Sequence, residues 1–276
     1  MGQPDGNLSG SRTWFQPIKY AMNKLLEEIL RTGVMNLADG EQIPVHSAIG
    51  LREIELIQRI IRDIRPARTL EVGMAYGIST LAICEALIEI GGGPHIVIDP
   101  DQHEGKWGDG WRSGGLTNLE KAGFSEVLDF HEAPSHQVLP KLEAAGTRVQ
   151  FALIDGWPTF DYRLMDFVMV DRVLDVGGIL LMAATNMPGV RKACRFIATN
   201  RSYRVYDNVS TPHDHEVLAR VNKETRGLDV TESIRRHFKP ELREPDEELG
   251  LGRKSTAIAF LREDEDRRLW DYFEEF

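Results

Sequence analysis

Residues 69–80 read TLEVGMAYGIST and predict a strand, a glycine turn and the start of a helix. Gly73 and Gly77 allow the backbone to turn sharply and to approach a ligand closely. Ser79 and Thr80 belong to the residue types that cap helices, and we expect them to begin the apolar helix that follows. In a parallel α/β sheet such a loop opens at the carboxyl ends of the strands, where ligands bind.

The spacing of the glycines bears on the kind of ligand. A dinucleotide fingerprint reads G-x-G-x-x-G, whereas no glycine stands two residues after Gly73. The next predicted strand, residues 95–98, ends at Asp99, whose carboxylate can accept both hydroxyls of a ribose. An ordinary tight turn accounts for the glycines alone. With Asp99 added, the pattern favours a nucleoside ligand.

The segment from Glu71 to Ser79, which reads E-x-G-x-x-x-G-x-S, resembles the first motif of class I S-adenosylmethionine-dependent methyltransferases. It is most similar to the catechol O-methyltransferase-like branch, and the resemblance extends from about Ser47 to about Tyr203. The resemblance implies an α/β fold with a doubly wound, seven-stranded, mostly parallel sheet of the Rossmann-like kind and an N-terminal helical extension. It also implies S-adenosylmethionine as the cofactor.

The resemblance assigns candidate site residues as well. The loop after the first strand is expected to hold the methionine portion of the cofactor, Asp99 the ribose, and Ser135, His136 and Trp157 the adenine. The full set of candidate cofactor-binding residues is Glu71, Gly73, Tyr76, Gly77, Ser79, Asp99, Pro100, Ser135, His136, Asp155 and Trp157. For His136, an exposed histidine at a helix start is the alternative.

Two residues are candidates for catalysis. Asp155 follows the apolar run 151–154, and burial of its carboxylate would be costly unless it reaches the end of a strand. In the family the matching acid faces the transferred methyl group. His46 lies in the segment that the family folds over the methionine end, where a plain helix cap at Ser47 is the alternative reading.

The sequence departs from the catechol-type pattern in its metal and proton-transfer residues. The family's Asp-Asn pair, which completes a Mg²⁺ site, falls here on Ala184 and Thr185, and the catalytic lysine falls on Pro158. Mg²⁺ requires several hard oxygen ligands in octahedral geometry. We therefore assign no metal residues and regard a divalent metal as doubtful. Methyl transfer depends mainly on positioning and desolvation, so Asp155 or His46 can serve as base or positioning group.

Composition narrows the class of partner. The 276 residues are 42% hydrophobic and carry a formal net charge of −10, which disfavours nonspecific binding to nucleic acid or membrane surfaces. The two cysteines lie in helical patterns and favour a cytoplasmic protein. We expect a small-molecule methyl acceptor, such as a sugar or natural-product hydroxyl or amine, and a homodimer. We expect neither a nucleic-acid nor a membrane partner.

The chain divides into four expected segments. Residues 1–45 form an N-terminal tail and a helical extension or lid, with the helix beginning near Phe15. Residues 46–207 form the cofactor-binding core, and residues 208–254 form an insert that can cover the substrate. Residues 255–276 supply the last strand, antiparallel to its neighbour, and a C-terminal docking segment.

Three other functions remain open at this point. A chain that kept the cofactor pocket but lost the metal and proton-transfer residues can be a binding or assembly subunit. A nucleotide-dependent oxidoreductase is the second possibility. The third is an enzyme that binds S-adenosylmethionine and uses its positive charge in a rearrangement without methyl transfer.

Overall fold

The computed structural model describes residues 22–103, 110–210, 246, 248–252 and 254–276. The strands are β1 (Val34–Asn36), β2 (Gln42–Pro44), β3 (Thr69–Val72), β4 (His95–Ile98), β5 (Leu128–His131), β6 (Val149–Ile154), β7 (Leu174–Ala183), β8 (Tyr203–Ser210) and β9 (Ser255–Arg262). The helices are α1 (Lys24–Thr32), α2 (Leu51–Ile64), α3 (Ile78–Ile90), α4 (Gly114–Ala122), α5 (Ser135–Ala144), α6 (Phe160–Val173) and α7 (Pro188–Asn200), with a short 3₁₀ turn at Ser125–Val127.

The main sheet has seven strands in the order β5-β4-β3-β6-β7-β9-β8. The strands from β5 to β7 are parallel, and β9 is antiparallel to both β7 and β8. This confirms the predicted doubly wound sheet and its antiparallel last strand. The chain leaves β3 toward β4 and β5 and then returns to β6 on the other side of β3. The switch point between β3 and β6 is where ligands bind in open α/β sheets.

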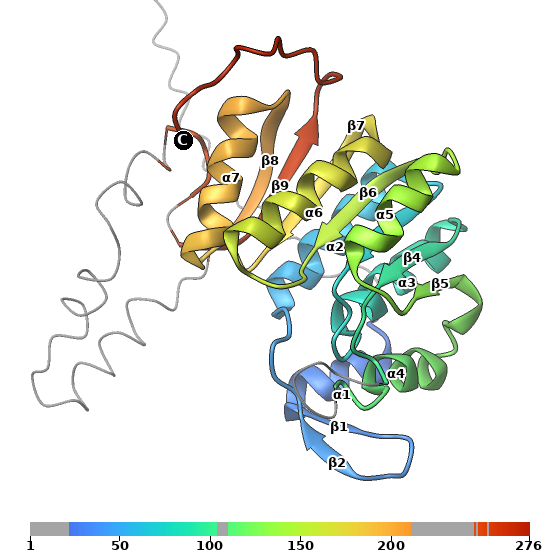
Figure 1. The fold of residues 1–276 in the computed structure, drawn as a ribbon. Coiled ribbons are helices and arrows are strands. Elements are labelled where there is room, and N and C mark those ends of the chain that lie inside the picture. Colours follow the sequence, from blue (N-terminus) through green and yellow to red (C-terminus); the bar gives the residue numbers. More distant parts are fainter. Residues whose placement is uncertain (1–21, 104–109, 211–245, 247, 253) are drawn as a thin grey trace, which may run out of the picture.

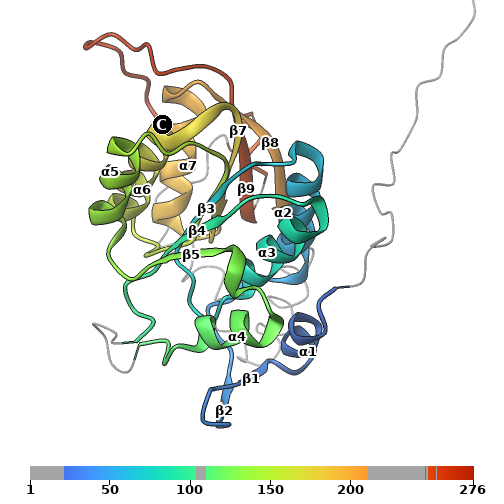
Figure 2. The same ribbon diagram turned by 90° about the vertical axis from the view of Figure 1, so that its right-hand side faces the viewer.

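Helices cover both faces of the sheet (Figures 1 and 2). Side chains alternate along β6, so that Ala152 and Ile154 pack with the cluster that includes α5, α6 and α7. Phe151 and Leu153 pack on the other face with α2 and α3. Because both faces of each central strand are buried, these strands are mostly apolar and show no alternation between buried and exposed residues. The sheet is therefore a rigid support for the loops at its carboxyl edge.

The N-terminal extension lies at one end of the molecule, next to α4 (Figure 1). The side chain of Asn23 caps α1, accepting a hydrogen bond from the Leu25 N–H at 2.9 Å. The helix was expected from residue 15, and residues 15–21 lie outside the described part of the chain. The hairpin β1–β2 follows α1, and its three-residue strands are too short to show a period-two pattern.

The C-terminal segment returns to α6 and α7. The Phe276 ring lies 5.2 Å from Phe196 and 6.4 Å from Phe160, between centroids. The Asn200 side chain exchanges two hydrogen bonds with the backbone of Glu274. Strand β8 continues to Ser210 and so includes the first three residues of the insert expected over 208–254, most of which lies outside the described residues. None of the helices within the described ranges is long and apolar enough to cross a bilayer.

Candidate active site

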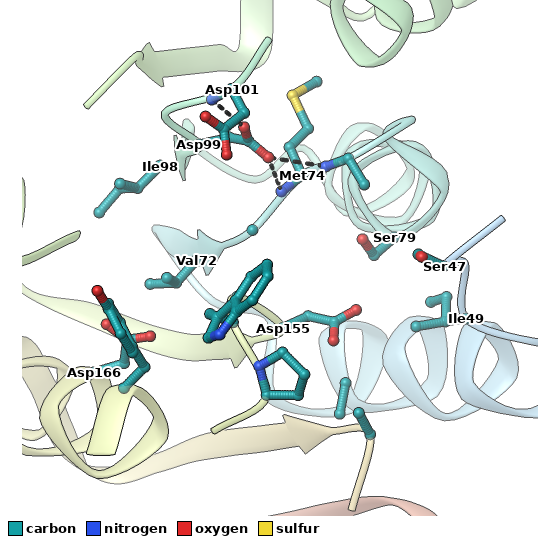
Figure 3. A pocket seen from close by; sticks show the side chains of 18 of the residues that line it. Ser47, Ile49, Val72, Met74, Ser79, Ile98, Asp99, Asp101, Asp155 and Asp166 are labelled. Carbon is teal, nitrogen blue, oxygen red and sulfur yellow. Dashed lines mark hydrogen bonds between the residues drawn. The ribbon is translucent and has the colours of Figure 1, made fainter. Parts of the chain in front are cut away.

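A cavity of about 910 Å³ opens at the carboxyl ends of β3, β4, β6 and β7 (Figure 3). Its position is the switch point between β3 and β6. Most of the residues predicted from the sequence line it, namely His46, Gly73, Tyr76, Ser79, Asp99, Pro100, Ser135, His136, Asp155 and Trp157. Glu71 in β3 and Gly77 in the loop after it do not line the cavity.

Glu71 is fully buried behind the loop. Its carboxylate accepts hydrogen bonds from the hydroxyls of Ser79 and Thr80, and His95 Nε2 lies 3.0 Å from Oε2. The expected capping of α3 by Ser79 and Thr80 is therefore wrong, and Gly77 occupies the N-cap position with φ +75°. A buried carboxylate requires donors, and it recruits the hydroxyls that would otherwise cap the helix. Glu71 holds the loop from behind.

Asp99 ties the same loop to the end of β4. Its Oδ2 accepts backbone N–H groups of Met74 at 2.8 Å and Ala75 at 2.9 Å, and its Oδ1 accepts the N–H of Asp101 at 2.9 Å (Figure 3). Burial raises the pKa of Asp99, opposed by these three backbone hydrogen bonds. A carboxylate has about four acceptor positions, and backbone N–H groups occupy three of those of Asp99. About one position remains to accept a ribose hydroxyl. Asp101, which also lines the cavity, was not a sequence candidate.

Asp155 follows β6 directly, and its N–H donates to Val72 O of β3 at 2.8 Å. Its side chain is 22% exposed and faces the cavity, with Arg163 Nη2 3.4 Å from Oδ1. Burial raises the pKa of Asp155 to about 6, although the Arg163 charge lowers it. Arg163 is fully buried and also donates to the backbone oxygens of Ile154 and Gly156. Asp155 is thus largely ionised at neutral pH and basic enough to accept a proton.

Three residues other than glycine have positive φ angles and line the cavity: Ser47 at 55°, Ala75 at 47° and Ala184 at 56°. Such conformations are uncommon for L-residues, and they gather at binding and catalytic sites because the surrounding structure must enforce them. At these three positions of the lining, the surrounding structure holds the backbone in a conformation that is unfavourable for an L-residue.

Aromatic rings form the wall on the N-terminal side. His46 Nε2 lies 3.0 Å from the Tyr76 hydroxyl, and His46 Nδ1 lies 3.2 Å from Ser47 Oγ. The Trp111 ring centroid lies 5.1 Å from that of Tyr76 and 5.9 Å from that of His46. Trp111 belongs to the loop after β4 and lines the cavity. Both ring nitrogens of His46 already have hydroxyl neighbours.

The donors at the cavity do not fit a Mg²⁺ site. Asp155 and Asn186 line it, but Thr185 Oγ1 is buried and donates to Ser255 O at 2.6 Å. The Arg163 guanidinium already lies beside Asp155. Within the described ranges no group of three or more His, Cys, Asp or Glu side chains is placed to hold a metal. Asp155 is therefore the one carboxylate of the expected ligand set at this position, and one of its oxygens already lies beside Arg163, which is too few oxygen ligands for the octahedral geometry of Mg²⁺.

Comparisons with known proteins agree with this geometry. A family model described as a methyltransferase domain matches residues 70–183, which run from β3 to the end of β7. A search of curated proteins finds no match.

Three solved structures have a similar fold. The O-methyltransferase TomG from Streptomyces achromogenes, involved in tomaymycin synthesis and solved with SAM, is 17% identical, with a TM-score of 0.50 over 59% of this chain and 75% of that one. The O-methyltransferase from Bacillus cereus, in complex with SAH, is 15% identical, with a TM-score of 0.54 over 68% and 84%. Cofactor-bound Rv0187 from MTB is 13% identical, with a TM-score of 0.54 over 79% and 83%. At such identities the likeness concerns the fold.

The family model identifies residues 70–183 as a methyltransferase domain, and the seven-stranded sheet has the Rossmann-like fold of such domains.

Proposed function

We propose that this methyltransferase transfers a methyl group to a hydroxyl or amine of a small molecule, of sugar or natural-product type, without a well-formed Mg²⁺ site. The single observation that carries the proposal is Asp155, a carboxylate with a pKa of about 6 that faces a large cavity at the sheet's switch point. A group with this pKa can take the proton of an acceptor hydroxyl or hold an acceptor amine at neutral pH.

The cavity offers a place for each part of S-adenosylmethionine, which supplies a methyl group on a positively charged sulfur. Gly73 and Ser79 lie where the methionine portion is proposed to bind, and Asp99 and Asp101 lie at the end of β4 for the ribose. Pro100, Ser135, His136 and Trp157 are proposed around the adenine. TomG and the Bacillus cereus enzyme were solved with SAM and SAH, which supports the same cofactor for this chain.

The remaining part of the cavity is proposed to hold the acceptor. His46 and Tyr76 form its N-terminal wall, and Asn186 and Thr256 line it from the ends of β7 and β9. The lining is mostly apolar, which limits water around Asp155 and strengthens its interactions with a bound acceptor. Because the departing proton of an amine is less costly to remove, Asp155 acts as a base for a hydroxyl and as a positioning group for an amine.

Mass spectrometry tests this proposal. The purified protein is incubated with S-adenosylmethionine and a panel of small-molecule hydroxyl and amine acceptors, and products are examined for a gain of about 14 daltons, one CH₂ unit. We expect a product whose yield is unchanged by EDTA. The Asp155→Asn variant should form it about a hundredfold more slowly, the usual contribution of a positioned acid or base.

Other outcomes separate the alternatives. A product that disappears with EDTA and returns with Mg²⁺ would contradict the metal-free site, and an unimpaired Asp155→Asn variant would contradict the role of Asp155. Binding of S-adenosylhomocysteine with no product from any acceptor would favour a binding or assembly subunit. A changed acceptor without a mass gain would favour a rearrangement.

A further inference from the structure

Asp166 is a buried carboxylate that the mechanism above does not use. It lies on α6, is 2% exposed and lines the cavity. Its Oδ1 accepts a hydrogen bond from Ser135 Oγ at 2.5 Å. Among the residues that the structure describes, no side chain or backbone group donates to its Oδ2. That oxygen lies 3.4 Å from the position a Cβ on Gly156 would occupy, so it stands over the segment between Asp155 and Trp157.

Asp166 and Asp155 occupy opposite parts of the cavity. Figure 3 shows Asp166 on the side of Ile98, whereas the Asp155 carboxylate points toward Ser79 and Ile49. Ser135, which donates to Asp166, is one of the residues proposed to surround the adenine. The free Oδ2 therefore faces the adenine end of the proposed cofactor position and lies away from the reacting end.

The chemistry of Oδ2 defines what it can bind. Asp166 lines the cavity, so a ligand that fills this end and displaces water from Oδ2 should bring a hydrogen-bond donor for it. On the edge of an adenine, the 6-amino group is the donor, while the ring nitrogens are acceptors. Ser135 cannot supply a second donor, because its single hydroxyl hydrogen is directed at Oδ1.

Resting on the proposed function, we infer that Asp166 accepts a hydrogen bond from the 6-amino group of the cofactor's adenine. Asp166 is thereby the residue that selects adenine over a 6-oxo purine. A 6-oxo base would place a carbonyl oxygen against the carboxylate and leave both acceptors unpaired, which sites built around a hydrogen bond reject strongly.

Isothermal titration calorimetry with two ligands tests this inference. The ligands are S-adenosylhomocysteine and its 6-oxo analogue, in which hypoxanthine replaces adenine. The unmodified protein should bind the first at least about tenfold more tightly, because one hydrogen bond is gained in one case and a buried acceptor is left unpaired in the other. Asp166→Asn should bring the ratio close to one, chiefly by tighter binding of the 6-oxo analogue. The Asn amide can turn either its oxygen or its NH₂ group to the base.

The test has a matched control variant, and several results would contradict the inference. Asp161, on the same helix and exposed, provides a matched Asp161→Asn variant that should keep the ratio of the unmodified protein. Tighter binding of one ligand cannot arise from general damage to the fold. Equal binding of both ligands by the unmodified protein, or an unchanged ratio in folded Asp166→Asn, would overturn the inference and leave methyl transfer intact. Failure of the unmodified protein to bind either ligand would instead count against the proposed function.

Discussion

At the scale of single residues, the segment from the end of β6 into α6 carries two carboxylates for which we propose different tasks. We propose that Asp155 acts at the reacting end and Asp166 at the adenine end, and the buried Arg163 charge lowers the pKa of both. Burial opposes that effect and dominates, so both pKa values are raised above the ordinary value for aspartate. The cost of burying Asp155 is a sign that it is retained for function rather than for stability.

This cost predicts how stability depends on pH. Burial raises the pKa of Asp155 from 3.8 to about 6, so the unfolded chain releases this proton at lower pH than the folded protein. The contribution of Asp155 to folding is therefore most favourable below pH 4, and it is lost as the pH rises toward 6. Asp155→Asn removes this loss. Its stability relative to the unmodified protein should rise between pH 4 and pH 7, by up to about 3 kcal/mol.

Urea denaturation of both proteins at several pH values measures this difference. Because other buried carboxylates titrate in both proteins alike, only the difference between the two reports on Asp155. A difference that stays constant from pH 4 to pH 7 would show that the pKa of Asp155 is not raised.

Only one of the three charged residues of this segment that line the cavity could be predicted from the sequence as a candidate site residue. Asp155 stood out because an acid follows the apolar run 151–154. Arg163 and Asp166 did not, because each is a charged residue in a helical pattern, and the sequence alone reads such residues as solvent-facing. Their burial is decided by packing of α6 against β6 and α5, which only the folded structure shows.

At the scale of elements, the loop between β3 and α3 is fixed by contacts on three sides. Glu71 holds it from behind, Asp99 holds it from β4, and Gly73 packs against the backbone at the end of β6. The strand–turn–helix order was predicted from the sequence. The residue that caps α3 was not predicted correctly, because the hydroxyls of Ser79 and Thr80 donate to the buried Glu71 carboxylate and do not cap the helix.

Gly73 offers a direct test of this packing. A Cβ at Gly73 would lie 2.5 Å from Asp155 O, and the φ of +92° is unfavourable for any other residue. Gly73→Ala should therefore destabilise the protein by about 2 kcal/mol or more, through both strain and displacement of Asp155. The matched control is Gly146→Ala, where φ is +70° and nothing lies within 4 Å of the added Cβ. It should lose only about 1 kcal/mol, from backbone strain.

Thermal or urea unfolding of the two variants provides the comparison. Equal losses of stability would mean that the close approach of β3's loop to β6 is not what requires glycine at position 73.

At the scale of the whole molecule, the architecture directs chemistry to one edge of the sheet. The order of the strands places the switch point between β3 and β6. The segment before α2 and the loop after β4 bring His46 and Trp111 next to Tyr76 of the β3–α3 loop at the same opening. The sheet was predictable because its strands are apolar runs ended by acids or glycines. The β1–β2 hairpin was not, because its short strands carry no periodic signal.

The central claim is that the cavity at this switch point binds an adenosyl sulfonium cofactor. Isothermal titration calorimetry of the unmodified protein with S-adenosylhomocysteine, with NAD in a parallel titration, tests it most directly. The geometry predicts saturable binding of S-adenosylhomocysteine at one site per chain and no measurable binding of NAD. Saturable NAD binding, with no heat from S-adenosylhomocysteine, would contradict the claim.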